Sequence, residues 1–151
     1  MSGVKATVFR ARLIGTGEAL RLKATLIVNG VTLRLYELIA AAPEHRVDTG
    51  RMRAGWAIAA EVAGDYAPAA VTPEQRRARK AGERLFDLPS SSSFLVAIAN
   101  APLEAKRVIF NNVEYAVWVE LGSDRMEGQH VVNLAVQRLV AGPPSVASMV
   151  A

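Results

Sequence analysis

The 151-residue chain contains no cysteine, only two histidines and few aromatic residues, and these absences limit what it can be. Without cysteine it can form no disulfide and can offer no thiolate as a metal ligand or nucleophile. Neither His45 nor His130 has the spacing to a carboxylate that a metal site requires. No glycine-rich phosphate loop, paired-carboxylate site or nucleophile elbow is present. We therefore expect a protein that is not an enzyme and uses no cofactor or metal.

Long apolar runs are also missing. The longest, such as residues 38–43, are far shorter than the roughly 20 residues that cross a bilayer. The first 12 residues lack the compact apolar stretch and cleavage site of a signal peptide, so we expect assembly in the cytoplasm without a membrane. A hydrophobic content of 51% is enough for one domain, here residues 1–151, that buries about two thirds of its unfolded surface.

A long amphipathic helix is predicted over residues 17–42. Thr16 is a candidate N-cap, and Pro43 would stop the helix. Before it, residues 4–13 fit either a strand or a helix. The helical prediction depends on apolar residues recurring every three or four positions: Leu20, Ala24, Ile27, Val31, Leu35, Leu38 and Ala42.

The rest of the chain predicts short strands and a final helix. Alternating apolar residues favour a strand over residues 56–62, and two more are expected over 94–99 and 107–110. A last helix is expected over 128–141, followed by a flexible arm over 142–151. The fold class is therefore α+β, with the long N-terminal helix packed on a small, mostly antiparallel sheet and additional short helices.

Residues 64–93 have a different composition and are interpreted as an excursion from the core. Thr72 and Pro73 predict the start of an exposed helix over 73–86, and the serines at 90–93 predict a flexible end. The basic residues of this stretch could form a solvated face, contact an acidic neighbour or line a DNA channel. They are Arg76, Arg77, Arg79, Lys80 and Arg84.

The first notable motif spans residues 47–56. Its Asp48-Thr49-Gly50 triplet also occurs in retroviral-type aspartic proteases, where two copies share one proton across a dimer. Here the flanking residues are charged, with Arg51 and Arg53 following the triplet, which disfavours that alternative. The preferred interpretation is that Asp48 caps a short helical turn leading into the strand at Trp56.

The second motif spans residues 111–122. Asn111 is a candidate N-cap, with Glu114 placed to complete a capping box for a helix over 112–121. Gly122 would end that helix with a positive φ. Tyr115 and Trp118 make the helix apolar around more of its circumference than one core face needs. The pair is either core or part of a surface covered by another subunit.

Taken in this order, the long helix and the two motifs resemble the tail-component family of tailed bacteriophages, which includes the tail completion protein, or minor tail protein Z, of lambda-like phages. The resemblance covers about residues 20–140. It departs from the family pattern at residues 44–46, which intervene between Pro43 and the first motif, and at Gly55, where the family has serine or asparagine.

The resemblance implies a structural virion protein that forms a ring in the neck, at the head-proximal end of the tail. Implied partners are other copies in a ring, six-fold like the tail, the connector or stopper, the tail terminator and the tail tube, with non-specific contact to channel DNA. The alternatives are a tail terminator ring and a DNA-binding accessory module. The residues expected at subunit interfaces are Asp48, Thr49, Gly50, Arg51, Arg53 and Trp56 on one side and Asn112, Tyr115, Trp118, Glu120 and Gly122 on the other.

Overall fold

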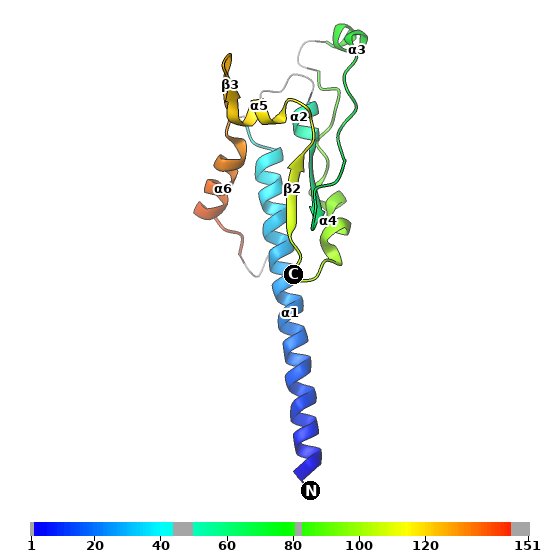
Figure 1. Cartoon of the computed structure of the whole chain (residues 1–151), viewed down its shortest axis with the longest axis vertical. Coiled ribbons are helices and arrows are strands. Elements are labelled where there is room, and N and C mark those ends of the chain that lie inside the picture. Colours follow the sequence, from blue (N-terminus) through cyan, green and yellow to red (C-terminus); the bar gives the residue numbers. More distant parts are fainter. Residues whose placement is uncertain (1, 44–49, 81–82, 146–151) are drawn as a thin grey trace.

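The fold is α+β, as the sequence predicted. The computed structural model describes residues 2–43, 50–80 and 83–145, with side chains from residue 14 onward. One long helix forms the axis of the molecule (Figure 1). Helices α4 (Ser91–Ala99) and α6 (Val131–Ala141) and the first of two small antiparallel sheets pack on its C-terminal half, whereas α3 (Pro73–Ala78) and β3 (Gly122–Ser123) lie beyond its end.

Helix α1 spans Ser2–Ala40 without interruption. The undecided segment 4–13 is therefore helical, and the prediction of an N-cap at Thr16 is wrong because capping needs a non-helical backbone there. Gly15 and Gly17 each weaken a helix by about 1 kcal/mol relative to alanine but do not break it, unlike proline. The N-terminal half of α1 projects beyond the other elements, whereas the C-terminal half lies among them (Figure 1).

The buried face of α1 is offset from the predicted apolar stripe. Its buried side chains are Asn29, Thr32, Tyr36, Ile39 and Ala40, whereas Leu20 at the start of the stripe is 62% exposed. Asn29 is tolerated inside because its amide donates to the carbonyl of Ile98 and accepts from Arg107. A polar network that periodicity could not reveal thus fixes this face.

The first sheet is an antiparallel ribbon of two strands, β1 (Trp56–Ala60) and β2 (Arg107–Asn111). Trp56 pairs with Asn111 and Ala60 with Arg107. Strand β1 ends two residues earlier than predicted because Glu61 adopts φ 66°, which extended pairing does not allow.

The expected strand over 94–99 is wrong, because this segment is helix α4 (Ser91–Ala99). A short apolar run fits either structure by periodicity alone. The hydroxyl of Ser90 accepts from the amide of Ser92 and caps the helix, so Ser90 to Ser93 form the start of a helix rather than a flexible end.

Helix α3 (Pro73–Ala78) begins where the sequence predicted, with a capping box between Thr72 and Gln75. It ends eight residues before the predicted end at 86, because Arg79 is extended. The segments on either side of α3 are tied to the core. Tyr66 donates to the carbonyl of Ala54, and Tyr36 donates to the carbonyl of Pro89.

The C-terminal third contains α5 (Ala116–Leu121), the hairpin strands β3 (Gly122–Ser123) and β4 (Met126–Glu127), and α6 (Val131–Ala141). The hairpin replaces an expected polar loop. Helix α6 begins three residues later than predicted and packs along α1. Of the predicted C-terminal arm, residues 146–151 lie outside the described residues.

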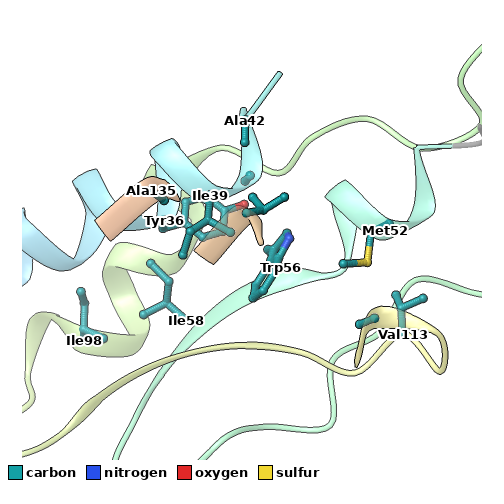
Figure 2. Packing of buried hydrophobic residues seen from close by; sticks show 12 residues of the cluster. Tyr36, Ile39, Ala42, Met52, Trp56, Ile58, Ile98, Val113 and Ala135 are labelled. Carbon is teal, nitrogen blue, oxygen red and sulfur yellow. The ribbon is translucent and has the colours of Figure 1, made fainter. Parts of the chain in front are cut away.

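The hydrophobic core joins α1, the ribbon, α4 and α6. Trp56 occupies its middle, between Tyr36 and Ile39 of α1 on one side and Met52 and Val113 on the other (Figure 2). Because Met52, Trp56 and Val113 belong to the two sequence motifs, the core connects directly to them.

Burial raises the pKa of Tyr36 to about 12, with a smaller contribution from Tyr66.

Candidate functional site

The two sequence motifs meet in space and form one unit, which we call the motif junction: residues 50–56 and 111–115. Helix α2 (Arg51–Ala54) lies against the turn that follows β2, and the pairing of Trp56 with Asn111 fixes their register. The sequence singled out both motifs but treated them as separate capped turns. Their direct contact was not predicted.

A buried arginine holds the motif junction together. Arg51 is only 8% exposed, and its guanidinium donates to both carboxylate oxygens of Glu114, at 2.6 and 3.1 Å. Its Nε donates to the carbonyl of Pro68, and the guanidinium lies 6.0 Å from the centre of the Tyr115 ring. Such a two-pronged pair is the strongest geometry available to arginine and a carboxylate. Arg51 therefore acts within the chain.

The predicted capping box in the second motif is wrong. Asn111 belongs to strand β2, and its side chain accepts from the amide of Val113 and donates to the carbonyl of Met52. Glu114 points to Arg51 instead of back to Asn111, and α5 starts only at Ala116. Glu114 binds Arg51 of α2 instead of forming the local cap, because the buried guanidinium of Arg51 needs a carboxylate partner.

Close packing at the motif junction favours glycine at position 55. A Cβ atom there would lie 2.5 Å from both the Asn111 side-chain oxygen and the Val113 side chain. Real Cβ atoms do not come so close, so the backbone of α2 can approach β2 only with glycine at this position.

Helix α2 begins directly after Gly50, its N-cap residue, which has φ 84°. A Cβ atom at Gly50 would lie 2.7 Å from the carbonyl oxygen of Phe86. Asp48 and Thr49, including the proposed cap by Asp48, lie outside the described residues. Gly50 itself is required both for its backbone angle and for the approach of the chain at Phe86.

Arg53 and Trp56 are also used inside the chain. Arg53 is half-buried and donates to the carbonyl of Ala40 at the end of α1, and burial followed by the nearby Arg84 lowers its pKa. Trp56 is 7% exposed, and its indole N–H has no hydrogen-bond partner in the described part of the chain. The structure thus places the arginines and the tryptophan of the first motif in internal contacts.

Glu120 is a cap for the last helix. Its two carboxylate oxygens accept from the backbone amides of Val131 and Val132, at 3.0 and 2.8 Å. Helix α6 needs this acceptor because His130, its own N-cap residue, has φ 50° and supplies no side-chain hydrogen bond. Asn112 is likewise used internally and donates to the carbonyl of Gly64.

Replacing Glu120 by alanine should therefore weaken α6. Loss of a helix cap costs about 0.5–2 kcal/mol of the free energy of unfolding, and denaturant titration would measure it. Glu127→Ala, at an exposed position in β4, is the matched control and should change stability by less than about 0.5 kcal/mol. Equal effects of the two substitutions would contradict the capping role.

The pair of Arg51 and Glu114 should make stability depend on acid pH. The hydrogen bond from Arg51, followed by one from its own backbone amide, holds the pKa of Glu114 below its ordinary value of 4.5. A depressed folded pKa contributes stability above the unfolded pKa, and this stability is lost as pH falls through the folded pKa.

We expect the denaturation midpoint of the wild-type chain to fall more steeply below about pH 4.5 than that of Glu114→Gln. Glu74→Gln, on the exposed surface of α3, is the control and should keep the wild-type slope. A Glu114→Gln variant with an unchanged acid limb would show that the pair does not stabilise the fold.

The remaining residues of the second motif form an exposed apolar surface. Trp118 is 59% exposed, Val117 63% and Leu121 68%, and we call these three the α5 patch. Tyr115 is half-buried and packs against the core. Beside the patch, β2 and α5 enclose a mostly apolar groove of about 340 Å³ lined by residues that include Ile109, Phe110 and Val117.

Of the basic residues predicted to matter in the excursion, Arg76 and Arg77 belong to α3, and Arg84 lies close to Arg53 of α2. Arg76, Arg77, Lys80 and Arg84 are exposed, and Arg79 is partly so. A second basic segment, in the N-terminal half of α1, was not predicted. Counting charges along the chain would have found its five basic residues and one acidic residue over residues 2–23.

Comparison with known proteins returned no matching family model, no matching curated protein and no matching solved structure. Within the described ranges, no group of three or more histidine, aspartate or glutamate side chains is arranged to hold a metal ion. Among the helices described, none is both long and apolar enough to cross a membrane.

Proposed function

We propose that this chain is a structural virion protein of a tailed phage or prophage that forms a ring in the neck and joins the tail to the capsid connector. The α5 patch is the observation that carries this proposal. Three large apolar side chains are exposed together on one short helix, and contiguous apolar surface of this kind marks interaction sites. These side chains sit on a helix whose position is fixed by the motif junction and the Glu120 cap.

The internal roles of the motif residues support an architectural function. The charges of Arg51 and Glu114 pair with each other, and Glu120 caps α6. These side chains therefore hold the α5 patch in position and are not free to bind a substrate. A ring subunit needs such rigidity, because each copy must present the same patch at the same angle to its neighbour. This function requires no catalytic residue and no cofactor.

Locating the chain in the particle tests the proposal. We expect mass spectrometry to detect it in purified particles and antibody-labelled electron micrographs to place it at the junction of head and tail. Removing its coding sequence should leave filled heads and separate tails. A chain absent from particles, or joined and infective particles without it, would overturn the proposal.

A DNA-binding module is the second candidate, and the exposure of Arg77, Lys80 and Arg84 favours it. If these three side chains contact phosphates, the triple alanine variant should weaken duplex DNA binding and lower the slope of log K against log salt by about 3. A wild-type chain that shows no salt-dependent DNA binding in a gel-shift assay would remove this candidate.

A further inference from the structure

The net charge of the chain lies on the N-terminal half of α1, residues 2–23. This half carries five of the 18 basic residues and one of the 14 acidic residues. Residues 24–151 therefore hold 13 of each sign, and the formal charge of +4 belongs to this half of the helix. The ion pair of Arg21 with Glu104 reduces it to +3. The charged residues of this half are Lys5, Arg10, Arg12, Glu18, Arg21 and Lys23.

The same half of α1 exposes large apolar side chains. Ile14 is 56% exposed, and Leu20 and Leu22 are each 62% exposed. The helix projects about 33 Å at 1.5 Å per residue and contains Gly15 and Gly17. Helices of this length are marginal in water without a packing surface, and glycine weakens them further. This half of the helix therefore needs a partner that offers apolar and acidic groups.

The other end of the same molecule offers both kinds of group. The α5 patch and the adjoining groove are apolar, and they lie at the opposite end from the N-terminus (Figure 1). Residues 111–130 carry four acidic residues against Arg125, a formal charge of −3, which the pairing of Glu114 with Arg51 reduces to −2. Asp124 and Glu127 are exposed on the hairpin beside α5.

We propose that the N-terminal half of α1 docks on the α5 patch and groove of a second copy of this chain. Ile14 and Leu22, which lie on the same side of the helix, supply the apolar contact, and the positive helix meets the acidic end of the neighbour. Pairing of α1 with α1 would bring two charges of +3 together, which disfavours a symmetric contact. The contact is head to tail, and an interface of this class forms a ring when the rotation between neighbouring copies closes. This proposal rests on the proposed function only where it takes the assembly formed by this contact to be the neck ring.

Mixing two defective chains tests this arrangement. The helix variant carries Ile14→Ser and Leu22→Ser, and the patch variant carries Trp118→Ser and Leu121→Ser. All four side chains are exposed, so both variants should melt as the wild type does. Val96→Ser, on the outer side of α4 and 80% exposed, is the matched control and should assemble normally.

Light scattering after size exclusion should show an assembled wild type, and each variant alone should be monomeric. An equimolar mixture should form a dimer and stop there, because only one of its two interfaces is intact. A patch variant that still self-associates would indicate pairing of α1 with α1 and overturn the proposal. A mixture that stays monomeric, or a wild type that is monomeric at about 1 mM, would overturn it too.

The electrostatic part of the contact has its own readout. Raising the ionic strength from about 0.05 M to about 0.5 M should weaken wild-type assembly several-fold, and Lys23→Glu should lessen this salt dependence. Salt-independent assembly would contradict a contact between opposite charges. None of these measurements uses a phage particle, so a chain missing from particles would refute the neck function and leave this interface standing.

Discussion

Trp56→Ala should destabilise the protein more than any other single truncation in the motif junction. The side chain is 7% exposed and packs between α1 and the residues Met52 and Val113, so its removal leaves a cavity at the meeting point of four elements. Truncations of this kind cost about 3–5 kcal/mol. For a chain of this size that lowers Tm by about 6–20 °C, which differential scanning calorimetry would record.

Trp56→Phe separates packing from polarity at the same position. Phenylalanine keeps an aromatic ring and removes the indole N–H, which is buried without a described partner. An unsatisfied buried donor costs about 1–3 kcal/mol, so its loss offsets part of the lost contact. We expect Trp56→Phe to lie well above Trp56→Ala in Tm. Equal losses for the two variants would mean that the indole N–H stabilises the fold after all.

Gly122→Ala should be the most damaging substitution at the end of α5. Gly122 has φ 90° and ψ 178°, a conformation that is essentially restricted to glycine and costs another residue about 1–3 kcal/mol. A Cβ atom there would also lie 2.7 Å from the amide nitrogen of Gly128 and 2.9 Å from the carbonyl oxygen of Met126. Both contacts are with backbone, so the hairpin must move.

We expect Gly122→Ala to lower the free energy of unfolding by about 3 kcal/mol or more, measured by denaturant titration. Gly142→Ala is the matched control, because its φ is −139° and the nearest atom to a new Cβ is 3.8 Å away. It should be neutral, or stabilising by up to about 1 kcal/mol. A tolerated Gly122→Ala would contradict the strained geometry of the hairpin.

The sequence predicted best where the signal is local. Thr72, Pro73 and Gln75 fix the start of α3 through contacts within one turn, and the start was correct. The positive φ at Gly122 was predicted for the same reason. The α+β class was also predicted correctly, because the long helix and the strands near residues 56–60 and 107–111 are recognisable from their own residues.

The sequence failed where distant contacts override local preference. Asn111 and Glu114 have the spacing of a capping box, but the buried Arg51 captures the carboxylate. Residues 94–99 contain β-branched and aromatic side chains, yet they form a helix capped by Ser90 and anchored at its end by Asn29. Neither partner is visible from within its own segment.

The sequence singled out the two motifs but did not predict that they contact each other. Arg51, Arg53 and Glu120 are used inside the chain, and Trp118, which the sequence left open between core and surface, is exposed. The charge on α1 was overlooked because a count over the whole chain gives only +4 and hides where it lies.

The packing of α6 along α1 affects how the polypeptide can fold during synthesis. Helix α1 leaves the ribosome first, but α6, which covers part of it, follows about 100 residues later. At roughly 5–20 residues per second, the uncovered side of α1 waits about 5–20 s for its last packing partner. During that interval the nascent chain exposes the apolar residues that α6 will cover, so the slow arrival of this helix is the stage at which premature association with another nascent chain has to be avoided.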